Sequence, residues 1–112
     1  MGLVSEAYTF NATDTMGSHA GWTEVTDYSE ATRPAVVFGE ASGASITNGV
    51  ERAAFTFNAE VITSGAFLCI GSNVKGAGDG ILFGEGAFSS GNHSAISGDK
   101  CYVTVTTTAV SL

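Results

Sequence analysis

The sequence predicts an all-β protein: a single-domain β-sandwich, jelly-roll-like, with an extended N-terminal strand or arm. Three observations predict this class. Glycine, serine and threonine supply 40 of the 112 residues, whereas leucine, a strong helix former, occurs only four times. Short apolar runs alternate with turn residues along the whole chain. No segment shows a 3.6-residue apolar period long enough for an ordinary helix.

One domain spanning residues 1–112 is expected, because the chain is long enough for a single core and shows no linker or repeat. Residues 3–10 (LVSEAYTF) have strand character, so residues 1–10 are predicted to form an edge strand or an arm that reaches a neighbour. The polar stretch 11–21 predicts a loop, and a short strand is expected at residues 22–26.

The stretch AVVFGEASGASITNG, residues 35–49, predicts a strand, a turn and the start of the next strand. The apolar residues 33–38 should form a largely buried strand, with Pro34 near its start, where a missing N–H is tolerated. The glycines that follow suit a tight turn. A ligand-binding glycine loop is not favoured, because no helix follows and no lysine or threonine is placed for a phosphate.

The second half of the chain predicts four more strands. Residues 52–58 and 101–107 alternate between apolar and polar side chains, as half-buried strands do. Residues 65–71 and 80–83 are continuous apolar runs, which is the pattern of central strands. The inward-facing residues of the two alternating strands are predicted to be Ala53, Phe55, Phe57, Cys101, Val103 and Val105.

The charge of the chain argues against two classes of partner. The net charge is −7, and only four lysines and arginines occur, scattered along the sequence. Nucleic-acid backbones and anionic membranes are bound by clustered cations, so neither partner is expected. The first ten residues lack the basic and apolar regions of a signal peptide, and no apolar stretch is long enough to span a membrane. Synthesis in a reducing cytosol is therefore predicted.

Motifs that would indicate an enzyme are weak. The S-x-x-K pattern occurs at residues 72–75 and 97–100, but both copies lie in predicted turns and lack the companion motifs. His19 and His93 fall in predicted loops without a set of metal ligands beside them. The glycine-rich stretch 75–86 matches neither a stacked calcium repeat nor a dinucleotide fingerprint. We therefore predict no catalytic residue, no cofactor and no metal.

Three alternatives stay open at this stage. Two of the eleven acidic residues could come together as a glycosidase-like pair, although solvated surface is the favoured interpretation. Aromatic side chains could line a sugar-binding face, although core or interface packing is favoured; they are Tyr8, Trp22, Tyr28 and Tyr102. Cys69 and Cys101 are expected to be free, buried thiols, but a disulfide between them requires a geometry that sequence does not reveal.

A surplus of apolar surface predicts that the protein works in an assembly. A chain of this size leaves a large share of its surface exposed, and few charged residues are available to cover it. The edge strands of an open sandwich also need protection. The N-terminal segment is the expected contact surface, and its candidate interface residues are Leu3, Val4, Tyr8, Phe10 and Trp22.

Five segments, in order AVVFGEASGASITNG, RAAFTFNAEV, GAFLCIG, GILFGEG and ISGDKCYVTV, resemble a family of small structural proteins of tailed bacteriophages. These proteins are of the tail-fibre-like and capsid-decoration type. The pattern consists of turn and core positions and covers residues 22–112. The residues that carry it are Phe38, Gly39, Ala41, Ser42, Gly43, Ile46, Asn48, Phe55, Phe57, Gly80, Gly84, Gly98, Asp99 and the strand 103–107.

The resemblance implies an architectural role in the virion. It leads us to expect a capsid decoration, or cement, protein that binds and stabilises the major capsid lattice after assembly in the host bacterial cytoplasm. The major capsid protein or another virion protein would be its partner, and it would form a homo-oligomer, for which a trimer is a natural arrangement. The alternative is a tail, neck or fibre-associated component, and a small carbohydrate-binding domain is a third interpretation. Relatives often carry a tryptophan before the equivalent of residues 61–71, which this chain lacks.

Overall fold

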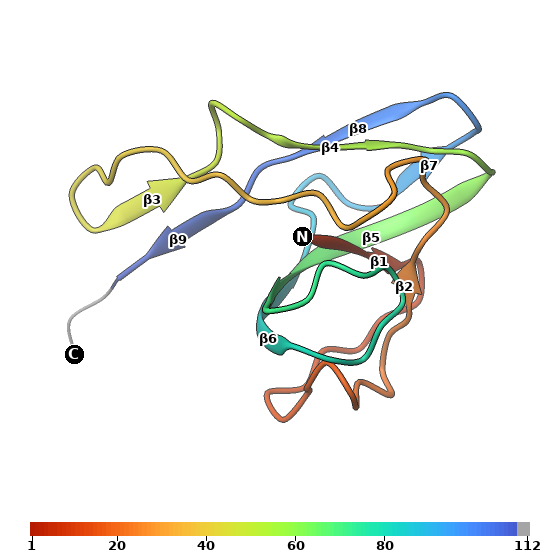
Figure 1. Cartoon of the computed structure of the whole chain (residues 1–112), viewed down its shortest axis with the longest axis horizontal. Coiled ribbons are helices and arrows are strands. Elements are labelled where there is room, and N and C mark those ends of the chain that lie inside the picture. Colours follow the sequence, from red (N-terminus) through yellow and green to blue (C-terminus); the bar gives the residue numbers. More distant parts are fainter. Residues whose placement is uncertain (110–112) are drawn as a thin grey trace.

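The computed structural model describes residues 1–109, and within them every regular element is a strand. The nine strands are β1 (Gly2–Ser5), β2 (Glu24–Val25), β3 (Ser45–Thr47), β4 (Ala53–Thr56), β5 (Val61–Ile70), β6 (Ile81–Ala87), β7 (His93–Ala95), β8 (Lys100–Val103) and β9 (Thr106–Thr108). All of the strand pairs are antiparallel. The predicted all-β class is confirmed, and the arrangement is consistent with a β-sandwich (Figure 1).

One layer is a five-stranded sheet built around β5. Its order is β2-β1-β5-β6, and β7 pairs with the first residues of β5. The first strand therefore pairs with a segment about sixty residues away: Leu3 lies opposite Ala66, and Val4 lies opposite Gly65. Residues 65–71 were expected to form a central strand, and this prediction is confirmed by the place of β5 in the sheet.

The second layer is a ribbon formed by two strand pairs, β4–β8 and β3–β9. Each strand of one pair leads along the chain into a strand of the other, so the two pairs follow one another. Figure 1 shows β4 and β8 lying over the main sheet, whereas β3 and β9 project beyond it. At the tip of the ribbon Ser42 and Ser45 exchange backbone hydrogen bonds around Gly43, whose φ of 60° suits the first central position of a hairpin turn.

The main core lies between the two layers. Phe55 and Phe57 on and after β4, Tyr28, and Leu3 on β1 are almost fully buried there. The predicted alternation of residues 52–58 is confirmed, because Ala53, Phe55 and Phe57 all face this core. The alternation of residues 101–107 is confirmed as well: Val103 is buried, Cys101 and Val105 pack against the core, and Tyr102 is exposed.

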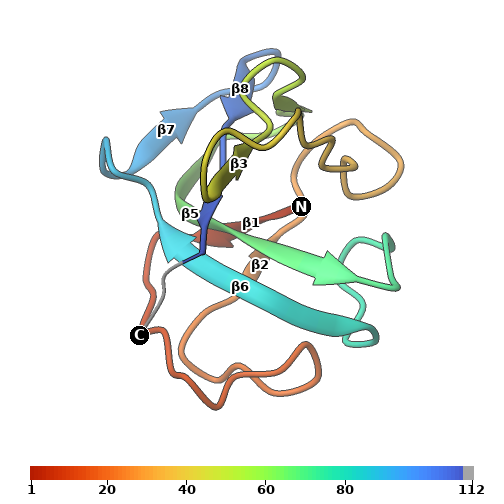
Figure 2. The ribbon, with the colours of Figure 1, turned by 90° about the vertical axis from the view of Figure 1, so that its left-hand side faces the viewer.

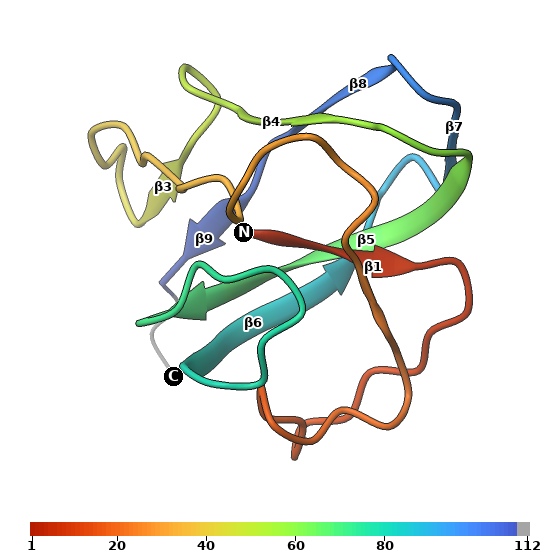
Figure 3. The same cartoon turned by 45° about the vertical axis from the view of Figure 1, so that its right-hand side comes forward.

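A smaller core covers the other face of the main sheet. The long loop of residues 6–23 folds beneath β1 and β6 (Figure 3) and brings Met16 and Trp22 against Val4 and Phe67. Successive residues of β1 therefore point into two different cores: Leu3 into the main one and Val4 into the smaller one. Only a strand with both faces covered can bury two neighbouring large apolar side chains completely.

Three predictions about individual segments are wrong. The predicted N-terminal strand is present as β1, but residues 1–10 form neither an arm nor an edge strand, because β1 lies between β2 and β5 and is buried on both faces. Residues 33–38 are extended but form no strand, and Val37 and Phe38 are exposed, because no neighbouring strand pairs with them. Residues 80–83 begin β6, which is an edge strand rather than a central one.

Candidate functional site

A groove lined largely by apolar side chains, with a volume of about 930 Å³, lies on the surface of the described residues. Its lining residues come from the main sheet and from the segment that leads toward β3. Figure 2 shows β3 and β8 of the ribbon above β5 and β6 in that view. Residues 33–38 form one wall, the ends of β5 and β6 form the other, and the loop after β5 closes one end. We define the apolar groove by the side chains that line it with apolar atoms: Val36, Phe38, Leu68, Ile70, Val74 and Phe83.

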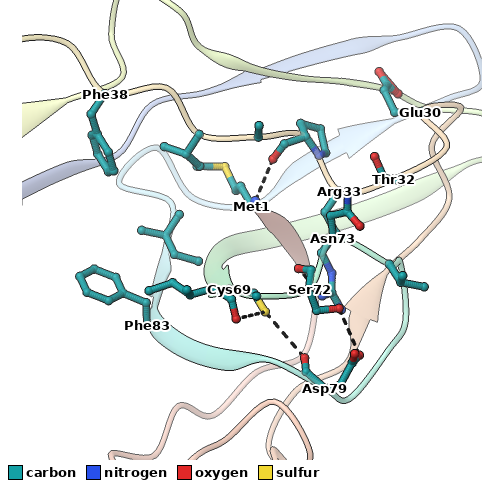
Figure 4. A pocket seen from close by; sticks show the side chains of 17 residues that line it. Met1, Glu30, Thr32, Arg33, Phe38, Cys69, Ser72, Asn73, Asp79 and Phe83 are labelled. Atoms are coloured by element: carbon teal, nitrogen blue, oxygen red, sulfur yellow. Dashed lines mark hydrogen bonds between the residues drawn. The ribbon is translucent and has the colours of Figure 1, made fainter.

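Large apolar side chains concentrate around this groove. Phe38, Ile70 and Phe83 are 37%, 54% and 58% exposed, and Val74 is exposed to a similar degree. In Figure 4, Phe38 and Phe83 stand on facing sides of the opening, and Arg33 lies toward its other end. Ile81 lies opposite Ile70 in the β5–β6 ladder and extends the apolar surface past the groove. Contiguous apolar surface of this kind marks interaction sites on soluble proteins.

A buried ion pair supports the inner end of the groove. Arg33 donates two hydrogen bonds to the carboxylate of Glu24, from Nε at 2.9 Å and from Nη2 at 2.7 Å. The same guanidinium donates to the carbonyls of Ala77 and Ser72, which lie in the loop between β5 and β6. The hydrogen bonds to Glu24 raise the pKa of Arg33 above its usual value, so the guanidinium stays charged. Arg33 is therefore used to hold the loop in place.

The remaining charged side chains that line the groove are acidic. Glu30 and Asp79 line it, and the exposed Glu40 follows Phe38 by two residues. The α-ammonium group of Met1 also lies there, but it donates to the carbonyl of Pro34 at 2.8 Å, and burial lowers its pKa. An incoming molecule would therefore meet an apolar surface with carboxylates beside it.

The loop between β5 and β6 carries the first S-x-x-K pattern and is anchored to the rest of the protein by hydrogen bonds. Lys75 Nζ donates to the carbonyl of Tyr28 at 2.7 Å and lies 4.4 Å from the centroid of the Tyr28 ring. Ser72 Oγ donates instead to the carboxylate of Asp79 at 3.1 Å. The lysine and the serine of this pattern each have another partner, so both act here as loop anchors.

A second groove, of about 750 Å³, lies between β6 and the β8–β9 side of the ribbon. The two grooves share Leu68 and Phe83 in their linings. Both grooves lie beside β6, at the edge of the main sheet that the ribbon does not cover. Its lining differs in charge, since it includes Arg52 and Lys100 as well as Glu85. Arg52 lies over the ring of Tyr102, with 4.7 Å between the guanidinium carbon and the ring centroid.

The structure places most of the predicted interface residues inside the protein. Leu3 and Val4 are fully buried and Trp22 is 4% exposed, so the expectation that they form a contact surface is wrong for the folded chain. Tyr8 remains exposed and Phe10 is half-buried, and the two rings lie 4.9 Å apart on the outer loop. The N-terminal segment is apolar because it fills two cores.

Sequence reasoning missed the residues that do form an apolar surface, namely Phe38, Ile70, Val74, Ile81 and Phe83. The signal for them was present, because the two continuous apolar runs of the sequence end at Ile70 and Phe83. Such runs were assigned to the interiors of central strands. A run that continues past the area covered by the opposite layer gives the same pattern but leaves its end exposed.

The structure brings one pair of acidic residues together. Asp14 of the outer loop accepts hydrogen bonds from the Asn11 N–H at 3.0 Å and from Trp22 Nε1 at 3.2 Å. Glu85 on β6 lies near enough for the pKa values of the two carboxyls to affect one another. One oxygen of Glu85, Oε2, is shielded from solvent. Burial and then Asp14 raise the pKa of Glu85, whereas the Asn11 N–H is the main cause that lowers the pKa of Asp14. Asp14 uses one oxygen, Oδ2, to bind both the outer loop and the indole of Trp22.

The other candidate groups have ordinary surroundings. Cys69 and Cys101 are free thiols, both half-buried, and burial raises the pKa of Cys101. The ring of His19 stacks on Trp22 with 3.8 Å between the centroids. His93 lies on β7 rather than in the expected loop. Tyr28 is buried in the main core, and burial raises its pKa well above its usual value.

Residues 1–109 contain no helix long and apolar enough to cross a membrane. Across the same residues, no three histidine, cysteine, aspartate or glutamate side chains gather where they could hold a metal ion. The apolar groove is the described feature that most resembles a binding surface, because large apolar side chains are exposed around it. Comparison with known proteins gave no match to a family model, to a curated protein or to a solved structure.

Proposed function

We propose that this protein is a structural component of a tailed-bacteriophage virion, a capsid decoration protein that binds the lattice of the major capsid protein. The observation that carries the proposal is the apolar groove, in which Phe38, Ile70 and Phe83 stand exposed on a small sandwich. The resemblance of the turn and core motifs to small phage structural proteins supports it from the sequence. Binding would stabilise the mature shell, because the protein would prefer the assembled lattice over free subunits.

The test is reconstitution on shells purified from virions that lack this protein. Added protein should bind in hundreds of copies per shell, counted by quantitative mass spectrometry, and should raise the temperature at which the shells release their DNA. A count of a few to a few dozen copies per virion would instead assign the protein to the tail, neck or fibre. A glycan array that gave specific binding would favour a carbohydrate-binding domain.

Self-association remains a separate prediction. A homo-oligomer, for which a trimer would suit local three-fold positions of a shell, should be visible by analytical ultracentrifugation at micromolar concentration and physiological salt. A stable monomer under these conditions would contradict obligatory self-association while leaving lattice binding intact.

A further inference from the structure

We propose that the apolar groove binds a cationic apolar segment of the major capsid protein, in which apolar side chains enter the groove and an adjacent lysine or arginine faces its acidic rim. This inference rests on the proposed function and adds the contact surface and the chemistry of the partner.

The apolar part of the partner follows from the walls of the groove. Phe38 and Phe83 lie at the same end of the groove on opposite walls (Figure 4), and Ile70 and Val74 also line it and are exposed. These side chains come from three separate parts of the chain. Phe38 lies in the segment before β3, Ile70 and Phe83 lie on the paired strands β5 and β6, and Val74 lies in the β5–β6 loop, which Lys75 anchors. A preformed surface loses little conformational entropy on binding, so burying it favours association.

The cationic part of the partner follows from the charges. Asp79 and Glu30 line the groove, and Glu30 also accepts the N–H of Thr56. The two cations there have partners within the chain: Arg33 makes two hydrogen bonds to Glu24, and the α-ammonium of Met1 donates to the carbonyl of Pro34. Lys75 is directed to the carbonyl and the ring of Tyr28. A positive group on the partner would therefore gain attraction at the rim, and a negative group would be repelled.

The same charges disfavour a second copy of this chain as the occupant. Each copy carries a net charge of −7 and only four lysines and arginines. Arg33 and Lys75 are used internally, and Arg52 and Lys100 line the second groove. Contact between the grooves of two copies would place carboxylates against carboxylates. A partner with positive charge fits this surface better.

The first experiment compares variants on shells that lack the protein. Phe83→Ser removes a ring from the groove wall, and Ile96→Ser removes an apolar side chain that is 62% exposed in the turn before β8, outside the lining of both grooves. Phe83→Ser should weaken binding to the shells at least tenfold, and Ile96→Ser should change it less than twofold. Both positions are exposed, so both variants should keep the thermal unfolding midpoint of the wild type within a few degrees.

The second experiment tests the charge. Asp79→Asn removes a carboxylate from the groove rim, and the exposed Glu60→Gln removes one elsewhere on the chain. Asp79→Asn should weaken binding to the shells about two- to fivefold and reduce its salt dependence between 50 and 300 mM NaCl, because screening then has less attraction to remove. Glu60→Gln should leave affinity and salt dependence at their wild-type values. Equal effects of the two variants would overturn the assignment of a cationic partner.

Each failure has a distinct meaning. Wild-type protein that binds shells, together with Phe83→Ser that binds equally well, overturns the groove inference and leaves the proposed function standing. A dimer that Phe83→Ser disrupts and Ile96→Ser does not would make a second copy the occupant and overturn the partner assignment.

If the wild-type protein does not bind shells, the proposed function is wrong. The chemistry of the groove is then tested with two synthetic peptides, KVIVK and EVIVE. In NMR titrations the first should shift the resonances of Ile70 and Phe83 more than those of Ile96. Equal shifts with both peptides, or none, would overturn the inference.

Discussion

The side chain of Asn48 takes the place of a backbone peptide group opposite Val105. Its Oδ1 accepts the N–H of Val105 at 2.7 Å, and its Nδ2 donates to the carbonyl of Val103 at 3.1 Å. Asn48 is fully buried and lies between β3 and β4, where the chain turns outward and the ladder with β8 and β9 would otherwise break. One asparagine therefore joins the two strand pairs into a continuous ribbon and sets where β3 and β9 project.

Replacing Asn48 should be costly. Asn48→Ala would leave the Val105 N–H and the Val103 carbonyl without these partners, and the expected loss is about 1–3 kcal/mol of unfolding free energy. Asn48→Asp should also destabilise, because a carboxylate cannot donate to Val103 and would be buried. Urea denaturation measures both changes. The exposed Asn92→Ala is the control and should lie within about 0.5 kcal/mol of the wild type; a similar loss in all three variants would contradict the bridging role.

The Arg33–Glu24 pair should be the most sensitive ionic contact to single substitutions. Arg33 is buried and makes bonds to Glu24 and to the loop carbonyls of Ser72 and Ala77. Arg33→Met would leave Glu24 as an uncompensated buried carboxylate, at an expected cost of about 3–5 kcal/mol. Arg52→Met is the matched control, because Arg52 is exposed and its contact with Tyr102 contributes about 0.5–1 kcal/mol. Chemical denaturation should separate the two variants clearly.

Stability should fall with rising pH because of Glu85. Its pKa is raised above 4.5 in the folded protein, first by burial and then by Asp14. A group with a raised pKa contributes stability that is complete below its unfolded pKa and is lost as the pH rises through the folded pKa. Asp14 acts in the opposite sense: its lowered pKa contributes stability above 3.8 that is lost as the pH falls through the folded value.

Glu85→Gln tests this relationship. Glutamine keeps the shape and can donate to Asp14, so the variant should be more stable than the wild type on the alkaline side of the Glu85 titration. The fall of the urea midpoint with rising pH, starting just above pH 4.5, should disappear. Glu60→Gln controls for the change in net charge. A Glu85→Gln profile that runs parallel to the wild type would show that the raised pKa of Glu85 does not affect stability.

Gly2 should tolerate no side chain. A Cβ atom there would overlap the ring of Phe67, which is buried beneath Trp22 and the Arg33 guanidinium and has no space to move. Gly2→Ala is expected to destabilise by about 1–3 kcal/mol through overpacking. At Gly49 the nearest atom to a new Cβ is 3.6 Å away, so Gly49→Ala should be close to neutral. Thermal unfolding of the two variants compares them directly.

Several elements could be predicted because their patterns depend only on neighbouring residues. The alternation in residues 52–58 identified Ala53, Phe55 and Phe57 as core residues, and the turn residues around Gly43 located the hairpin tip. Such patterns report which side chains prefer burial and where the backbone must reverse. They do not report which other strand provides the cover.

The groove could not be predicted for that reason. Phe38, Ile70 and Phe83 look like core residues in sequence, but their exposure depends on where the ribbon diverges from the main sheet. This divergence depends on pairing between distant segments and on the polar bridge that Asn48 makes, neither of which leaves a periodic signal. The burial of Leu3 and Val4 was missed likewise, because β1 becomes an internal strand only through its pairing with β5.

The sequence by itself determined that this protein is all-β, that it has few lysines and arginines, and that alternating strands contribute to its core. Only the tertiary structure decided which apolar residues remain at the surface and that acidic groups lie beside them. The physical reason is that local composition sets the secondary structure and the total charge, whereas exposure depends on which distant segments meet. An apolar run is core where a second layer covers it and becomes a contact surface where that layer ends.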